Sequence, residues 1–313
     1  MKPTGNKLVR RYRVNYSIPP EAKITEEMIL NHWELEKRLT KKLLESTPEN
    51  RWQVFERCYT KLYNELDWLN RFAEKDEKTT ESLDKKYKNW IETIGKPPQT
   101  IYEIGSGKGE FISFLAKYGF KCKGTEITKE RGEKYSHDIK NLSWGISDGV
   151  HLDSFEKQES YDVVISNQVI EHLHPLDLTA HLKGIYNILR KNGRYILNTP
   201  HSYTGPHDIS RVFKCSKPLG MHLKEYTYRE LVQALKNTGF RRIYRILPST
   251  IRRILYHIGI KDIVKWSILY LNFMVAVEII LSFIFSRKLR RFCSLILRRT
   301  FIFMDSIFLV AEK

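Results

Sequence analysis

Cysteine is scarce and scattered in this chain of 313 residues. Its four cysteines show no paired spacing; they are Cys58, Cys122, Cys215 and Cys293. The pattern predicts neither a disulfide framework nor a zinc site, and it fits a reducing compartment. The first twenty residues are basic but lack an apolar core, so we expect no secretory signal there. Internal repeats and low-complexity tracts are also absent, so a repeat architecture is not expected.

Acidic residues are few in the last quarter of the chain. The net charge is +17, and residues 241–300 hold thirteen Lys or Arg against Asp262 and Glu278, a net +11 (13 − 2). Nucleic-acid grooves combine solvated basic residues with scattered aromatics. Here arginine pairs bracket long aliphatic runs instead, a composition typical of amphipathic helices at a membrane interface. The stretch therefore favours contact with an anionic membrane over nucleic acid.

A long apolar run lies inside this basic stretch. Residues 266–285 hold one charge, Glu278, and are long enough to cross a bilayer. An acid at mid-membrane costs about 2.5–3.5 kcal/mol. The chain after the run must also return to the sheet expected for residues 241–247 and 305–312. We therefore expect the run to enter and leave on one face, either docked on a membrane or folded as a buried helical hairpin.

A glycine-rich turn is the most informative motif. Residues 101–109 are Ile-Tyr-Glu-Ile-Gly-Ser-Gly-Lys-Gly, an apolar strand that runs into a turn containing Gly105, Gly107 and Gly109. Glycine permits positive φ and lets a ligand lie against bare backbone. Residues 110–118 then show the apolar spacing of a helix. Strand, turn and helix together predict a nucleotide-type binding corner.

Three acidic residues stand at regular places around this turn. Glu103 precedes it, Glu126 ends the apolar segment 120–127, and Asp148 follows the segment 142–146. A carboxylate at the end of the second strand can accept both ribose hydroxyls. A nicotinamide dehydrogenase is the main rival, but its glycine spacing is Gly-x-Gly-x-x-Gly rather than Gly-x-Gly-x-Gly.

This ordered series resembles the class I S-adenosylmethionine (SAM)-dependent methyltransferases over residues 99–313. The resemblance implies an α/β, Rossmann-like fold whose seven-stranded sheet is mostly parallel with an antiparallel last strand. It also implies SAM as the cofactor. The residues that it implies for cofactor binding are Glu103, Gly105, Gly107, Gly109, Glu126, Asp148 and Asn167.

The chain divides into four parts on this interpretation. They are an N-terminal helical extension and linker, the SAM-binding core, a basic hydrophobic helical insertion and the closing strand, at residues 1–98, 99–247, 248–304 and 305–313. The extension should contain helices at 26–44 and 49–72, the second starting at Thr47-Pro48. The apolar face of that second helix predicts either a lid over the cofactor and a wall of the substrate pocket, or plain packing on the sheet.

The segment after the fourth expected strand, 162–166, bears on catalysis. Glu171-His172 resembles the Glu-His pair of the ubiquinone-biosynthesis O-methyltransferases, and together with His222 it resembles the plant-type small-RNA 2′-O-methyltransferases. The resemblance implies that Glu171, His172 and His222 lie at the acceptor side, as catalytic residues and as ligands of Mg²⁺ or another divalent cation. Gln168 replaces the first glutamate of that motif, which removes one charged oxygen ligand.

The function expected from the sequence is methyl transfer from SAM to an oxygen, or a nitrogen, of a small or lipid- or glycan-linked acceptor. Quinone or surface-glycan biosynthesis is the leading context, with the enzyme cytoplasmic and peripheral at the inner face of the membrane. An RNA methyltransferase is the runner-up, suggested by the charge. A non-catalytic SAM-binding scaffold at the membrane is the alternative from another class.

Overall fold

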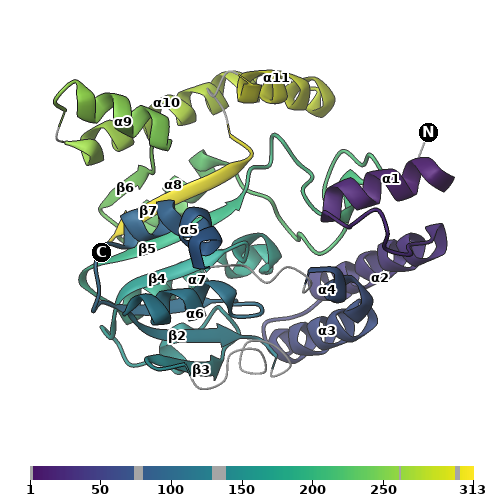
Figure 1. The fold of residues 1–313 in the computed structure, drawn as a ribbon, viewed down its shortest axis with the longest axis horizontal. Helices are drawn as coiled ribbons and strands as arrows, with labels where there is room; N and C mark the ends of the chain where they lie inside the picture. The colour runs from purple at the N-terminus through teal and green to yellow at the C-terminus, as the bar shows by residue number, and fades with distance from the viewer. Residues whose placement is uncertain (1–2, 74–79, 129–138, 261, 300–303) are drawn as a thin grey trace.

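A seven-stranded sheet with helices on both faces forms the body of the molecule (Figure 1). The computed structural model describes residues 3–73, 80–128, 139–260, 262–299 and 304–313. The strands are β1 (Thr100–Ile104), β2 (Lys121–Glu126), β3 (Leu142–Ile146), β4 (Tyr161–Asn167), β5 (Leu189–Pro200), β6 (Arg242–Arg245) and β7 (Ser306–Glu312). The helices are α1 (Gly5–Tyr16), α2 (Glu26–Leu44), α3 (Arg51–Glu65), α4 (Asp67–Ala73), α5 (Thr80–Ile94), α6 (Glu110–Tyr118), α7 (Leu178–Ile188), α8 (Tyr228–Thr238), α9 (Ser249–His257), α10 (Ile263–Ser282) and α11 (Arg287–Arg299).

The strand order is β3-β2-β1-β4-β5-β7-β6. Neighbouring strands from β3 to β5 are parallel, whereas β7 lies antiparallel between β5 and β6. The predicted Rossmann-like sheet with an antiparallel last strand is therefore confirmed. In such a sheet the carboxyl ends of the parallel strands meet at one edge, where ligands bind.

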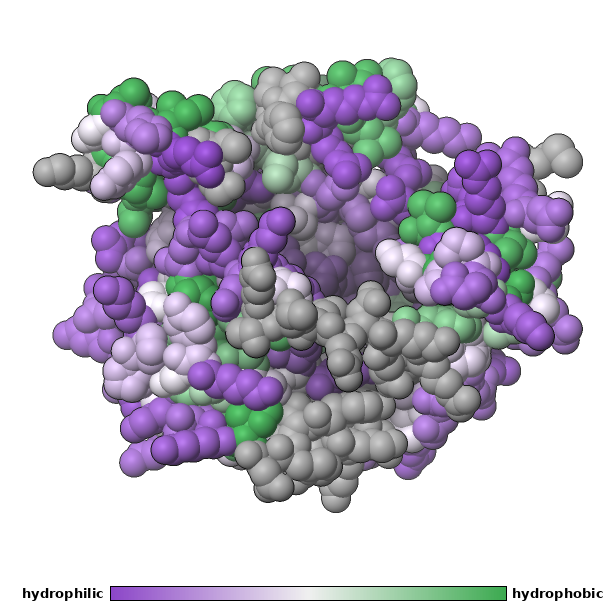
Figure 2. All heavy atoms as spheres, viewed as in Figure 1, coloured by the Kyte–Doolittle hydropathy of each residue, from purple (hydrophilic) through white to green (hydrophobic). Residues whose placement is uncertain are grey.

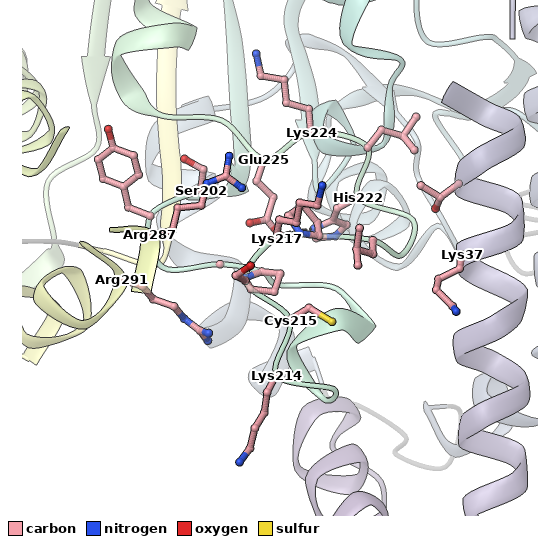
Figure 3. Close-up of a pocket in the computed structure, with 18 of the residues that line it drawn as sticks. Lys37, Ser202, Lys214, Cys215, Lys217, His222, Lys224, Glu225, Arg287 and Arg291 are labelled. Carbon is pink, nitrogen blue, oxygen red and sulfur yellow. Dashed lines mark hydrogen bonds and ion pairs between the residues drawn. The ribbon is translucent and has the colours of Figure 1, made fainter. Parts of the chain in front are cut away.

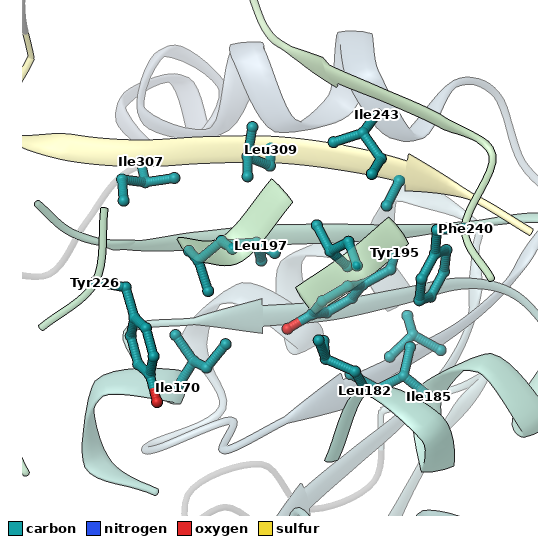
Figure 4. Packing of buried hydrophobic residues seen from close by; sticks show 14 of the residues in the cluster. Ile170, Leu182, Ile185, Tyr195, Leu197, Tyr226, Phe240, Ile243, Ile307 and Leu309 are labelled. Atoms are coloured by element: carbon teal, nitrogen blue, oxygen red, sulfur yellow. The ribbon is translucent and has the colours of Figure 1, made fainter. Parts of the chain in front are cut away.

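Two apolar cores lie on the two faces of the sheet. On one face α5 and α6 pack through residues such as Trp90 and Phe111. On the other face α7 and α8 pack against the sheet, with Tyr195, Leu309 and their neighbours fully buried (Figure 4). Burial on both faces explains why the central strands are nearly continuous apolar runs. The cores fix the strand ends that hold the site.

The N-terminal helices differ in part from expectation. Helix α2 has the predicted bounds, but the second helix begins at Arg51 with Asn50 as its N-cap residue, so the predicted start at Thr47-Pro48 is wrong. The Asn50 side chain instead accepts a hydrogen bond from the Thr47 amide, 3.0 Å away. The predicted single helix is also split at Leu66 into α3 and α4.

The insertion contains α9, α10 and α11, which lie together along one border of the molecule (Figure 1). Helix α10 contacts β6 and α8. Its protein-facing stripe is Ser267, Leu271, Met274, Glu278 and Leu281. The opposite stripe is exposed and includes Trp266, Leu269, Phe273 and Ile280. Hydrophobic residues accordingly gather at the surface over these helices (Figure 2).

By length and composition alone, α10 is apolar enough to cross a membrane. Its acid, however, is bound by the protein: the Glu278 carboxylate accepts hydrogen bonds from His201 Nε2 and from the Tyr228 and Arg229 amides. After the insertion, β7 pairs with β6, the strand that precedes it. The insertion therefore leaves and rejoins the sheet at the same edge.

Candidate functional site

The glycine turn follows β1 and leads into α6. Gly105, Gly107 and Gly109 have φ of 65°, 57° and 74°, the left-handed region that glycine adopts without strain. A Cβ at Gly105 would lie 2.7 Å from Val169 Cγ2, so a larger residue does not fit there. The positive φ values, and at Gly105 the contact with Val169, explain why glycine stands at these positions.

Two carboxylates stand at the ends of the neighbouring strands. Glu126 ends β2 and accepts hydrogen bonds from the Gly107 amide at 2.6 Å and the Ile127 amide at 3.2 Å. Asp148 follows β3 and accepts from the Val150 and His151 amides, both at 2.8 Å. Backbone amides fix both side chains, so each acid holds a set position beside the turn.

A cavity of about 400 Å³ opens at this edge of the sheet. Five of the seven residues predicted to bind the cofactor line it: Gly105, Gly107, Glu126, Asp148 and Asn167. The other two, Glu103 and Gly109, are not among its lining residues. The cavity unites side chains from three strand ends with bare backbone, which suits a nucleoside with a charged tail.

Glu103 is buried near the end of β1, just before the turn, and does not line the cavity. Its side chain is buried, and burial raises its pKa to about 8, against the lowering effect of a hydrogen bond with Ser106. Among the described residues its Oε2 has no hydrogen-bond partner. The hydrogen bond of Glu103 with Ser106 connects the end of β1 to the turn.

Helix α3 closes the cavity from the opposite side. Its residues Phe55, Tyr59, Leu62 and Tyr63 line the wall, the position expected of the predicted lid. The Tyr59 hydroxyl has no hydrogen-bond partner in the described part of the chain. Its ring meets the His172 ring edge-on, with centroids 6.4 Å apart. The sequence pattern marked Tyr59 only as part of an apolar face, so its place beside His172 was missed.

Glu171, His172 and His222 come together beside the cavity. Potential ligand atoms of the three side chains lie within 4.8 Å of one another, and the two histidine rings are edge-to-face with centroids 4.8 Å apart. The first two residues belong to a short 3₁₀ turn after β4, Ile170–His172. His222 comes from the loop before α8, so only the folded chain joins it to the pair.

Hydrogen bonds orient each member of this cluster. His172 Nδ1 donates to the Met221 carbonyl at 3.0 Å, which leaves its Nε2 as an acceptor. His222 Nδ1 lies 2.9 Å from the Glu225 carboxylate. Glu171 Oε2 accepts from the Thr199 hydroxyl at 2.9 Å, whereas the buried Oε1 has no partner among the described residues.

Burial and neighbouring charges shift the pKa values of these groups in different directions. It raises the pKa of Glu171 to about 7, partly opposed by His222, and lowers the pKa of His172 to about 3, aided by His222. The pKa of His222 is raised, because its hydrogen bond to Glu225 and the nearby carboxylates outweigh burial. Burial acts against ionisation of Glu225, but hydrogen bonds with His207 and His222 hold its pKa at about 2. His222 is therefore the more basic histidine of the cluster.

A second, larger cavity of about 840 Å³ adjoins the cluster on its other side. His222 and Glu225 line it (Figure 3). His172 lines the first cavity. Glu225 was not predicted as a site residue, because a spacing of three residues from His222 in a loop does not by itself indicate a pair. The three-residue cluster thus lies where the two cavities meet.

Comparisons with known proteins bear on the family and the fold. A family model described as a methyltransferase domain matches residues 66–244. Among solved structures, the chain is similar to a SAM dependent methyltransferase from Archaeoglobus fulgidus, with 18% identity, 77% of this chain and 98% of that chain covered, and a TM-score of 0.48. It is also similar to 1,6-didemethyltoxoflavin-N1-methyltransferase from Burkholderia thailandensis, with 12% identity, 86% and 91% covered, and a TM-score of 0.50. That structure has S-adenosylhomocysteine and 1,6-didemethyltoxoflavin bound. No curated protein matches the chain.

Proposed function

The chain belongs to the methyltransferase-domain family as a SAM-dependent enzyme, and we propose that it methylates an oxygen of a small or lipid- or glycan-linked acceptor. One observation supports this most: His172 faces the cofactor cavity, and His222 faces a separate large cavity, with their rings in contact. A methyl donor in the first cavity and an acceptor in the second would meet at this cluster.

The cofactor cavity has the groups that SAM requires. Glu126 and Asp148 are acceptors for ribose and adenine donors, and the glycine turn allows close approach of backbone amides. When bound, SAM supplies a sulfonium methyl that is already activated for in-line displacement. The protein's main tasks are therefore to position the acceptor and to take up its proton.

His222 is the residue best placed to take up the acceptor's proton. Its Nδ1 is bound by Glu225 at 2.9 Å, so Nε2 is left as the acceptor atom. The Glu225 carboxylate, its pKa held low by His207 and His222, stabilises the imidazolium formed when Nε2 accepts a proton. A basic histidine suits a hydroxyl acceptor, which must lose its proton as the methyl group arrives. This supports oxygen over nitrogen.

A test needs no purified acceptor. Tritiated SAM is incubated with the enzyme and with lipid or aqueous extracts of the source cells. We expect a base-stable, non-basic labelled product that His222→Ala lowers by about 10²-fold or more, while affinity for S-adenosylhomocysteine changes less than about twofold. The matched control is His257→Ala, an exposed histidine on α9. Label recovered on a basic nitrogen, or full activity of His222→Ala, would contradict the proposal.

The same cluster supports a second candidate role, as the site of a divalent cation. Both histidines donate through Nδ1 to a carbonyl or carboxylate, the outer contacts that metal-bound histidines typically make. The partnerless Glu171 Oε1 supplies an oxygen ligand. Glu171, His172 and His222 would hold Mg²⁺ or a similar cation, which would orient and acidify the acceptor hydroxyl. In that case His222 Nε2 is a ligand rather than the base.

Direct metal binding separates the two roles. If the cation is part of the enzyme, Mn²⁺ titration followed by electron paramagnetic resonance should detect one site that Glu171→Gln and His172→Ala each weaken at least tenfold. His257→Ala should leave it unchanged. Full label transfer in EDTA, with no Mn²⁺ bound, would exclude the cation and leave His222 as the base.

We also propose that α9, α10 and α11 place the enzyme at the cytoplasmic face of an anionic membrane. The exposed apolar stripe of α10 and the exposed Leu289, Phe292 and Ile296 of α11 support this location. Basic residues of α11 lie next to that apolar face, the arrangement of an interfacial helix.

A further inference from the structure

The large cavity next to His222 is strongly basic. Among its lining residues are nine Lys or Arg and two Glu, a net +7 (9 − 2). One wall comes from α11, the opposite wall from α2, and the floor from the loop between β5 and α8. Figure 3 shows Arg291 and Lys37 on opposite sides of the opening, with Lys217 beside His222. Such a concave surface of one sign focuses an electrostatic field on its interior.

Intramolecular contacts account for only part of this charge. Lys37 pairs with Glu34 at 2.7 Å and Lys224 with Glu230 at 2.9 Å, while Lys41 lies 3.8 Å from Glu45. Arg290 donates to the Ile284 carbonyl. Five cations of the wall form no ion pair with any described carboxylate; they are Lys214, Lys217, Arg287, Lys288 and Arg291. Glu225 offsets this charge only in part: it acts on Arg291 but is hydrogen-bonded to His207 and His222.

Arg291 shows the local excess of positive charge most directly. Its Nε is buried and has no hydrogen-bond partner in the described part of the chain. Burial lowers the pKa of its guanidinium, and the nearby cations Arg211 and Arg11 lower it further, against the raising effect of Glu225 and Asp305. Holding like charges together in a partly enclosed space costs free energy that an anionic ligand would recover.

We infer that this cavity binds a phosphate or diphosphate group of the methyl acceptor. Guanidinium groups bind phosphate oxygens through paired N–H donors, and lysines add point charges. The methylated hydroxyl lies at His222 on the floor, and the phosphate lies toward Arg287 and Arg291 on the α11 wall. This inference rests on the proposed function and adds the acceptor's chemical class and orientation to it.

The dimensions and surroundings fit such an acceptor. A volume of about 840 Å³ exceeds a single phosphate and suits a sugar or nucleoside bearing one or two phosphates. Outside the cavity, α11 also has the exposed apolar residues Leu289 and Phe292, close in sequence to these cations. The same phosphate chemistry is present in a soluble phosphorylated metabolite and in a lipid-linked headgroup, so the experiment must separate these sources.

The probe is inorganic pyrophosphate, titrated calorimetrically into the full chain saturated with S-adenosylhomocysteine. We expect binding that the triple variant Lys214→Gln, Lys217→Gln, Arg291→Gln weakens at least thirtyfold. The control is Lys117→Gln with Lys236→Gln, two exposed lysines outside the cavity. Affinity for S-adenosylhomocysteine, measured separately, should stay within twofold in all variants, so that loss of the cofactor site or of the fold would be recognised. Arg291→Lys should fall between wild type and the triple variant, because it keeps the charge without the planar donors.

Two further arms identify the source. Phosphatidylcholine vesicles containing phosphatidate should weaken pyrophosphate binding to the cavity if the phosphate is lipid-borne. If the source is soluble, the same vesicles should leave pyrophosphate binding unchanged. If the wild-type protein bound pyrophosphate no more tightly than the triple variant does, the inference would be overturned, while the cofactor assignment would stay intact. The inference would also be overturned if the wild-type protein bound a single-stranded RNA tightly but showed no measurable pyrophosphate binding, and the triple variant lost the RNA binding. RNA would then be the acceptor.

Discussion

At the residue scale, Glu126 has two tasks in the cofactor site. Its carboxylate accepts a hydrogen bond from the Gly107 amide and so closes the glycine turn. The same side chain lines the cofactor cavity. Gly107 has φ of 57°, which a β-branched residue adopts only with strain. The two residues therefore form one unit, in which the turn positions the acid and the acid holds the turn.

This pairing gives a prediction for cofactor affinity. Glu126→Ala should weaken the binding of S-adenosylhomocysteine by about 1.5–3 kcal/mol, the contribution of a hydrogen bond to a charged acceptor. Gly107→Val should weaken it at least as much, because the turn must change shape. Calorimetric titration measures both, and Glu159→Ala, an exposed acid away from the cavity, serves as the control. Unchanged affinity in both variants would refute the assignment of this cavity to the cofactor.

At the element scale, local patterns predicted the elements around the glycine turn and helix α2 better than the rest of the N-terminal extension. The glycine turn, α6 and β3 have the bounds expected from sequence because apolar runs and glycines specify them locally. The break at Leu66 and helix α1 were not predicted. The path of α1 depends on distant contacts, such as those of Tyr12 with His32 and Trp68.

The candidate site shows the same division. The sequence marked Glu171, His172 and His222 through a family resemblance, and the fold brings their side chains together. Tyr59 and Glu225 were not marked as site residues. Neither has a motif of its own; each gains its place because α3 folds over the cavity and the loop before α8 returns to β4. Such proximity arises from tertiary packing and leaves no periodic signal.

Glu278 links the insertion to the core and gives a prediction at this scale. Its buried carboxylate accepts hydrogen bonds from the Tyr228 and Arg229 amides at the start of α8 and from His201 Nε2. Glu278→Ala removes these acceptors and should lower the free energy of unfolding by about 3–5 kcal/mol. Glu278→Gln, which keeps one acceptor oxygen, should cost less. Urea unfolding measures both; the exposed Glu34→Ala is the control.

The contrary result would be informative about α10. If Glu278→Ala unfolded with the wild-type midpoint, its carboxylate would not fasten α10 to α8. Helix α10 would then be free to leave the sheet, and a membrane-inserted arrangement would become the better description. The hydrogen bonds in the structure argue for a helix fastened along one face instead.

At the scale of the whole molecule, three surfaces are arranged in order. The cofactor cavity lies at the carboxyl ends of the strands, and the basic cavity lies next to it. Helix α11 joins the basic cavity to the exposed apolar surface along the border of the molecule (Figures 1 and 2). An enzyme docked through that surface would have the opening of the basic cavity near the lipid headgroups. This order unites the membrane proposal with the phosphate inference.

Vesicle binding tests the arrangement as a whole. Each basic residue near an anionic surface contributes about 1 kcal/mol, and each buried apolar side chain adds insertion free energy. Wild-type protein should float with vesicles that contain acidic lipid and much less with neutral ones, and salt should weaken but not abolish flotation.

Arg253→Gln with Arg299→Gln, and separately Phe273→Ser with Phe292→Ser, should each weaken binding about tenfold or more. All four side chains belong to exposed residues of α9, α10 or α11 and lie outside the basic cavity. Leu176→Ser, an exposed apolar residue remote from the insertion in sequence, should change nothing. A wild-type protein that stays monodisperse without detergent and ignores acidic vesicles would show that the three helices only cap the core, since neither their charge nor their exposed apolar stripe would then be recognising a surface.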